Sequence, residues 1–133
     1  MPIDTLTATE RLVGETSGTG WLDRINDNFR YRFGAEGQTK TANYTLVLAD
    51  ASKLTRVDPT SGAVTITTPA ASTCAGVAFL VEALNVTNTV TIDGNASETV
   101  NGSATKTIGT AGRLVILRSD GTNWNAWFYD RLP

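Results

Sequence analysis

Short strand-like runs separated by turn clusters fill the chain from Asn43 onward, and they constrain its fold more than any other feature. β-branched residues recur within the runs, and Gly, Asn, Asp and Pro cluster between them. The runs that we expect to form strands are YTLVL, LTRV, AVTIT, GVAFLVEA, TVTI, ETV, RLVILRS and NWNAWFYD. Their spacing predicts a mainly β body over residues 43–133, arranged as an antiparallel β-sandwich or jelly roll.

Turn-forming residues between the runs support this interpretation. Asp-Gly pairs at Asp93 and Asp120 and the Asn-Gly pair at Asn101 are strong hairpin signals, because these residue types accept the positive φ of tight turns. In DPTSGA, Pro59 and Gly62 stand where a turn requires them.

The faces of the expected strands are of two kinds. AVTIT and TVTI place apolar residues on one side and threonines on the other, which predicts strands with one face in water. VAFLV and LVIL are apolar on both sides. A central position in a sheet explains this pattern for a monomer, and a subunit interface explains it for an oligomer.

A single stretch, residues 21–34, has the period of an α-helix. Its apolar stripe covers about a third of the helical circumference and consists of Trp21, Leu22, Ile25, Phe29 and Phe33. Thr19 or Gly20 caps its start, and Gly34 suits its C-terminal end. The helix is roughly 20 Å long and too short to be stable alone. We expect it to dock, either on one open end of its own sandwich or at an interface with a partner.

Residues 1–20 precede this helix and have neither a helical nor a strand period. The run GETSGTG is a flexible hinge by composition, so we expect a flexible N-terminal arm that becomes ordered on a partner. Aromatic residues and Arg dominate the energetics of interfaces. The candidate attachment residues are therefore those of the helix: Trp21, Leu22, Ile25, Phe29, Tyr31 and Phe33.

Composition argues against several classes of function. The net charge is −2 and the 11 basic residues are scattered, which disfavours nucleic acid as a partner. The chain has no His and one Cys, so we expect no catalytic site, metal site or cofactor. The opening residues resemble neither a signal peptide nor an anchor, and we expect no membrane association.

Four aromatic residues crowd the last expected strand. Alternation places Trp127 and Tyr129 on one face and Trp124 and Phe128 on the other, so at least one pair belongs to the core. A sugar-binding platform is the alternative use of an exposed aromatic ring. The candidate residues for such surface recognition are Asn123, Trp124 and Asn125.

Several of these segments together resemble a small β module of tailed-bacteriophage virion proteins. The resemblance covers about residues 20–129 and rests on GWLDRINDNF, YTLVLADASKLTRVD, SGAVTITTP, TVTIDGNASETVNG and LRSDGTNWNAW. It implies a homotrimer whose N-terminal segment attaches to the particle and whose β body projects outward. Residues 1–20 and the helix would then be the attachment region.

The resemblance leads us to expect a protein of the virion surface, made in the host cytoplasm. Because the chain lacks a shaft, heptads and a collagen-like repeat, we expect a capsid decoration (cement) or head-fibre protein that binds the major capsid protein or another virion protein. A tail-fibre or tail-spike component that binds the host receptor is one alternative. A stand-alone carbohydrate-binding module, with a host surface glycan as partner, is the other.

Overall fold

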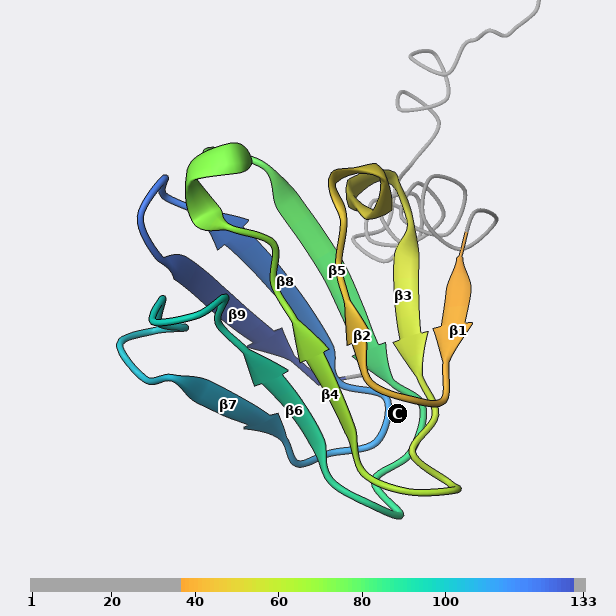
Figure 1. Ribbon diagram of the computed structural model, residues 1–133. Helices are drawn as coiled ribbons and strands as arrows, with labels where there is room; N and C mark the ends of the chain where they lie inside the picture. The colour runs from red at the N-terminus through yellow and green to blue at the C-terminus, as the bar shows by residue number, and fades with distance from the viewer. Residues whose placement is uncertain (1–36, 131–133) are drawn as a thin grey trace, which may run out of the picture.

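Two β-sheets face each other across a shared core (Figure 1). The structure is a computed structural model that describes residues 37–130. Within that range it contains strands and 3-10 helices but no α-helix, so the expected mainly β class is confirmed. The expected arm, residues 1–20, and the expected helix, residues 21–34, lie outside the described residues.

Nine strands form the two sheets. The five-stranded sheet has the order β1 (Gln38–Lys40), β3 (Leu54–Val57), β5 (Ala78–Ala83), β8 (Leu114–Ser119) and β9 (Trp124–Tyr129). The four-stranded sheet has the order β2 (Tyr44–Thr45), β4 (Val64–Thr67), β6 (Val90–Asp93) and β7 (Thr105–Ile108). Two 3-10 helices, η2 (Leu48–Ser52) and η3 (Ala71–Thr73), lie in the β2–β3 and β4–β5 connections at the same end of the body (Figure 1).

The chain alternates between the sheets from β1 to β6. Each new strand therefore lies beside the strand two elements earlier and runs parallel to it. Thr55 pairs with Val81, and Ile66 pairs with Ile92, at an equal sequence offset in the two sheets. The chain thus makes stacked turns around the core, and the antiparallel strands β7, β8 and β9 complete the two sheets.

The expected antiparallel sandwich is wrong in this respect, because both sheets are mixed. Period-two alternation indicates which side chains face the core, but it does not give the direction of the neighbouring strand. The DPTSGA turn illustrates the difference. The Gly62 N–H donates to the Pro59 carbonyl at 3.3 Å, and the turn leads β3 across to β4 in the opposite sheet instead of closing a hairpin.

Two of the three hairpins predicted from Asp-Gly and Asn-Gly pairs are confirmed. Asp120-Gly121 joins β8 to β9, and the Asp120 N–H donates to the Asn123 carbonyl at 3.0 Å. Asn101 and Gly102 have φ of 51° and 81°, and they form a tight turn closed by hydrogen bonds between Val100 and Ser103. Asp93 ends β6, but a loop through this Asn101 turn precedes β7, so Asp93 and Gly94 do not form a two-residue hairpin.

Several predicted strand limits also differ from the structure. β1 begins at Gln38, ahead of the expected start of the body at residue 43, and β7 was not predicted. The YTLVL run forms only β2 before the chain enters η2, and the ETV run contributes only the isolated bridges of Val100. The LTRV run coincides with β3.

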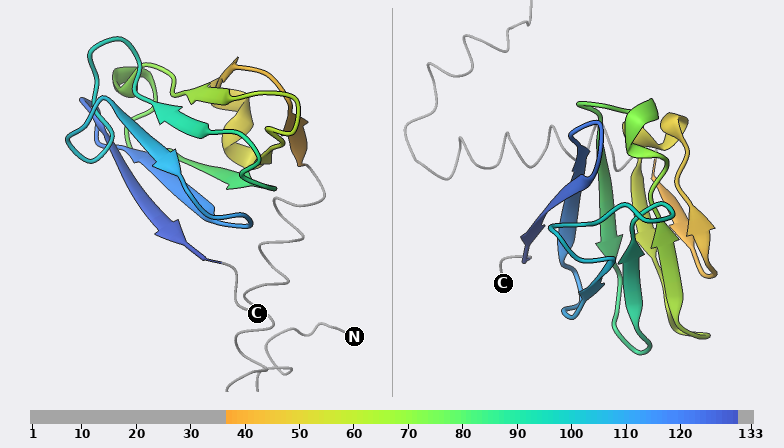
Figure 2. Two further views of the ribbon diagram at one scale, coloured as in Figure 1. Left: turned by 90° about the horizontal axis from the view of Figure 1, so that it is seen from below. Right: turned by 60° about the vertical axis from the view of Figure 1, so that its left-hand side comes forward.

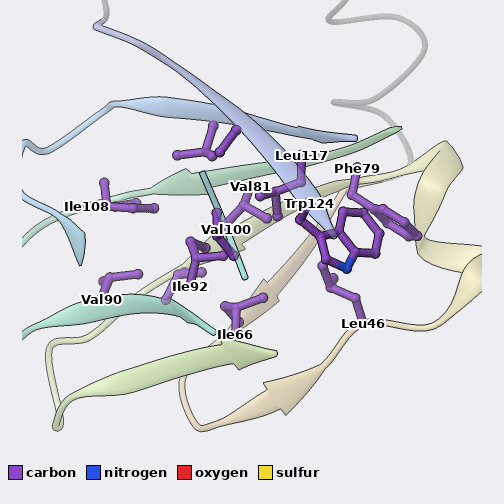
Figure 3. Close-up of a cluster of buried hydrophobic side chains, with 14 of the residues drawn as sticks. Leu46, Ile66, Phe79, Val81, Val90, Ile92, Val100, Ile108, Leu117 and Trp124 are labelled. Atoms are coloured by element: carbon purple, nitrogen blue, oxygen red, sulfur yellow. The ribbon is translucent and has the colours of Figure 1, made fainter. Parts of the chain in front are cut away.

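The core lies between the sheets and is closely packed. Phe79 and Trp124 from the five-stranded sheet meet at 5.7 Å between ring centroids, with Leu46 nearby (Figure 3). Branched aliphatic side chains fill the rest, including Val64, Ile66, Val81, Val90, Ile92, Val100, Ile108 and Leu117. Burial of this apolar surface is the main stabilising contribution to such a body.

Candidate functional site: the outer face of the five-stranded sheet

A row of apolar side chains crosses the outer face of the five-stranded sheet. On β5, Phe79 and Val81 point into the core, so Leu80 points outward. Direct pairing places Leu54 of β3 and Ile116 of β8 on either side of Leu80. Pairing of β8 with β9 extends the row to Trp127.

A second, mixed row lies beside the first: Arg56 of β3 pairs with Glu82 of β5, and Glu82 pairs with Leu114 of β8. Leu114 of β8 pairs with Tyr129 of β9, one step along the strands from the pair of Ile116 and Trp127. Trp127 is 45% exposed and Tyr129 is 51% exposed, whereas Leu80 is 5% exposed. We call this surface the apolar sheet face; its residues are Leu54, Leu80, Leu114, Ile116, Trp127 and Tyr129. It points away from the four-stranded sheet (Figure 2).

The outer face of the four-stranded sheet is polar by comparison. Its outward positions form two paired rows that consist of Thr45, Thr67, Asp93 and Thr105, and of Thr65, Thr91 and Thr107. This arrangement confirms the prediction that AVTIT and TVTI place threonines on the side away from the core. The outer face of the five-stranded sheet also carries Arg56, Glu82 and Arg118, so the two outer faces differ in the apolar row and in the exposed rings of Trp127 and Tyr129.

The strands predicted to be apolar on both sides are β5 and β8. Both occupy central positions in the five-stranded sheet, which is the explanation available to a monomer. Their second apolar side is the centre of the apolar sheet face. The structure describes one chain, so the alternative explanation, that these strands form a subunit interface, stays a prediction.

An ion pair marks one end of this face, beyond Tyr129. Arg113 Nε lies 2.6 Å from Asp130 Oδ1, and Arg113 Nη2 lies 3.2 Å from Asp130 Oδ2. The hydrogen bond from Arg113 holds the pKa of Asp130 below its ordinary value and raises the pKa of Arg113. The Arg113 guanidinium also lies 6.0 Å from the centroid of the Phe128 ring. These contacts orient the last residues of β9.

The three residues proposed for surface recognition do not form one exposed group. Trp124 is 1% exposed, and its Nε1 donates to Glu98 Oε1 at 3.2 Å. Asn123 is half-buried and accepts the Thr99 N–H at 2.8 Å, and Asn125 is exposed on β9. Of the two aromatic pairs that alternation distinguished, Trp124 with Phe128 faces the core.

The exposed aromatic pair is therefore Trp127 with Tyr129. Alternation placed these two rings on one face but could not decide whether that face was buried. The available signal was the two-sided apolar character of VAFLV and LVIL, which supply the neighbouring outward residues Leu80, Leu114 and Ile116. The attachment residues predicted on the helix, Trp21, Leu22, Ile25, Phe29, Tyr31 and Phe33, lie outside the described residues.

A buried carboxylate lies at the opposite edge of the sheets. Asp50 of η2 is 2% exposed and accepts hydrogen bonds from Gln38 Nε2, the Tyr44 hydroxyl and the Val47 N–H, each at 2.9 Å. Burial raises the pKa of Tyr44, and the hydrogen bond to the Asp50 carboxylate and its charge raise it further. Lys40 Nζ lies 3.6 Å from the centroid of the Tyr44 ring. The cluster joins β1, β2 and η2, which is a structural role.

Two further carboxylates, Asp58 and Asp120, accept hydrogen bonds within turns. Hydrogen bonds from Thr60 and Asn85 lower the pKa of Asp58, and backbone hydrogen bonds from Asn123 and Thr122 lower the pKa of Asp120. Among residues 37–130, no three His, Cys, Asp or Glu side chains are grouped so that they could hold a metal ion. Cys74 is buried.

The chain was compared with family models, curated proteins and solved structures, and none of the three comparisons found a match. The part of the chain that the structure describes contains no helix with the length and apolar character needed to cross a membrane.

Proposed function

We propose that this chain is a structural protein of a tailed-bacteriophage virion, a trimeric capsid decoration or head-fibre protein. Its partners are two further copies of itself and the major capsid protein or another virion protein. The arm and the helix, residues 1–34, form the attachment region, and the β body projects from the virion surface. The proposed role is mechanical stabilisation of the shell, without catalysis or a cofactor.

The observation that carries the proposal is the contrast between the two outer faces of the body. The four-stranded sheet presents threonines, whereas the five-stranded sheet presents the apolar sheet face with Trp127 and Tyr129 half-exposed. Extended apolar patches on a small domain typically mark interaction sites. A body with one threonine-rich outer face and one outer face that carries an apolar row and exposed rings suits a protein that assembles with others.

The segments that carry the resemblance to phage virion modules form central parts of the fold, and this supports the proposal. SDGTNW forms the β8–β9 hairpin and delivers Trp124 to the core, and NASETVNG supplies Glu98 and Asn101, which bind that hairpin. Both carboxylate oxygens of Glu98 also lie 3.0 Å from the Ala71 nitrogen. These residues stabilise the fold itself, which is consistent with a resemblance that extends over the whole β domain.

Threefold symmetry suits attachment to an icosahedral shell. Closed cyclic symmetry covers the interaction faces of all copies, and it matches the local threefold positions of such a shell. Three attachment segments that bind one site act at a high effective concentration, so each needs only a weak affinity.

The proposal is tested on particles and on the isolated protein. Sedimentation equilibrium at micromolar concentration should give about three times the chain mass of 14.1 kDa. Antibody labelling of purified particles in the electron microscope should place the protein on the head. A stable 14.1 kDa monomer that is absent from purified particles would contradict the proposal.

One observation favours a second function, a receptor-binding component of a tail fibre or tail spike. Trp127 and Tyr129 lie two residues apart on the same face of β9, and Asn125 shares that face. Exposed rings beside amide groups are suited to stacking on sugars. A Trp127→Ala variant that loses binding to host cell-surface glycan, with antibody label at the tail tip, would favour this function over the first.

A further inference from the structure

The apolar sheet face lies close to where the undescribed N-terminal part of the chain enters the fold. β1 begins at Gln38 and forms one edge of the five-stranded sheet, next to β3 with Leu54. The last residue of the predicted helix stripe, Phe33, lies only five residues earlier. We infer that the helix stripe packs on the apolar sheet face of its own chain. This inference does not rest on the proposed function.

The connection is long enough for this packing. Phe33 and Gln38 are separated by five Cα-to-Cα steps, which span at most about 17 Å in an extended chain. Neighbouring strands are about 4.8 Å apart, so the Leu80 position on β5 lies about 10 Å from β1 across the sheet. The end of the helix therefore reaches the centre of the apolar sheet face without any change in the described body.

The dimensions of the two surfaces also match. A helix over residues 21–34 is roughly 20 Å long, and a five-stranded sheet is about 19 Å across from its first to its last strand. The stripe covers about a third of the helical circumference, which is the width that one sheet face buries. Its three aromatic rings, Trp21, Phe29 and Phe33, are apolar like the row from Leu54 to Trp127 that would receive them.

Exposure along the row is lowest at its centre. Leu80 on the central strand is 5% exposed, Leu54 and Ile116 beside it are half-buried, and Trp127 on the far edge strand is 45% exposed. Because the short connection to β1 holds the two surfaces together at a high effective concentration, packing within one chain is favoured over packing between chains.

Trypsin digestion of the full chain tests the inference. Arg24, Arg30 and Arg32 lie within the predicted helix, and Arg11 in the arm is an internal reference for an undocked site. Docking should slow cleavage at the three helix arginines by about tenfold or more relative to Arg11, because a docked segment must open before it is cut. Cleavage of all four sites at one rate would overturn the inference.

Two matched variants assign the protection to the apolar sheet face. Ile116→Lys places a charge in the apolar row, and Thr91→Lys places the same charge on the outer face of the four-stranded sheet. Ile116→Lys should abolish most of the protection, and Thr91→Lys should retain it. Equal cleavage rates in the two variants would contradict docking on this face.

Disulfide trapping provides a second readout and distinguishes a neighbouring copy as the occupant. In a Cys74→Ala background, Ile116→Cys is combined with Ile25→Cys on the stripe or with Asp27→Cys on the opposite side of the predicted helix. With glutathione disulfide as oxidant, the Ile25 pair should form a bond within one chain, at a yield independent of protein concentration. A bond that links two chains, or equal yields for the Ile25 and Asp27 pairs, would overturn the inference.

Discussion

The side-chain amide of Asn101 forms both hydrogen bonds that a neighbouring strand would offer to Ala126. Asn101 Nδ2 donates to the Ala126 carbonyl at 2.9 Å, and Asn101 Oδ1 accepts the Ala126 N–H at 2.8 Å. The backbone N–H of Asn101 donates to the Trp124 carbonyl at 3.0 Å. One residue thus satisfies much of the free edge of β9, where an open edge would be a template for unwanted strand pairing.

We expect Asn101→Asp to lower the free energy of unfolding by about 1–3 kcal/mol. Aspartate accepts the positive φ of 51° at this position, so the change mainly removes the Nδ2 donor and sets a carboxylate against the Ala126 carbonyl. Urea denaturation measures the difference. Asn125→Asp adds the same charge at an exposed position on β9, and an equal loss in that control would contradict the edge-capping role.

Asp50→Asn keeps the shape of the side chain but should lower the free energy of unfolding. In Asp50→Asn one carboxylate oxygen becomes an NH2 group, which can no longer accept from the groups facing it. An unsatisfied buried donor costs about 1–3 kcal/mol. Tyr44→Phe removes one donor from the cluster and should cost less, about 0.5–1.5 kcal/mol.

A double-mutant cycle checks whether the two residues act together. If the hydrogen bond of 2.9 Å between the Tyr44 hydroxyl and Asp50 is part of one network, the losses measured by urea denaturation should not add in the double variant. Additive losses, or an Asp50→Asn variant as stable as the wild type, would indicate that the cluster does not hold η2 against β1 and β2.

Tyr44 should also make the free energy of unfolding fall as the pH rises into the alkaline range. The folded protein raises the pKa of Tyr44 above its ordinary value of 10.0, so the unfolded chain loses the phenol proton first. The contribution of the protonated Tyr44 to the free energy of unfolding is complete below about pH 10, and it is lost as the pH rises through the folded-state pKa of Tyr44. The unfolding free energy of Tyr44→Phe, measured by urea denaturation in this alkaline range, should therefore fall less steeply with pH. Equal slopes would contradict the prediction.

The sequence predicts which side chains face the core better than it predicts how the strands are connected. Alternation correctly separated Ile66 and Ile92 from the threonines beside them. It could not reveal that β4 and β6 run parallel, because the period of two is the same in both directions. The strands β1 and β7 were missed because QTK and TKTI offer one apolar residue between them, Ile108.

At the candidate site, too, the local sequence pattern could not predict which residues are exposed. The last strand places Trp124 and Trp127 on opposite faces, and only tertiary contacts decide which ring is buried. Glu98 accepts from the Trp124 indole, and Phe79 packs against that ring, but both lie far from it in the sequence. Such long-range pairs leave no mark in a short window of residues, so the apolar sheet face became visible only once β3, β5, β8 and β9 were aligned.

In the proposed function, the N-terminal attachment region joins a separately folded β body to a virion. This attachment is tested most directly by binding of Phe29→Ala and of the matched control Asp27→Ala to particles that lack the protein. With the stripe packed on the apolar sheet face, loss of the Phe29 ring costs about 3–5 kcal/mol and releases the helix that holds the attachment region on the body; each 1.4 kcal/mol is a tenfold change in the docked population. We predict that Phe29→Ala binds about a hundredfold or more weakly while its β-sheet circular dichroism is retained, and that Asp27→Ala binds like the wild type. Normal binding by Phe29→Ala, or loss of the β fold in that variant, would contradict the claim.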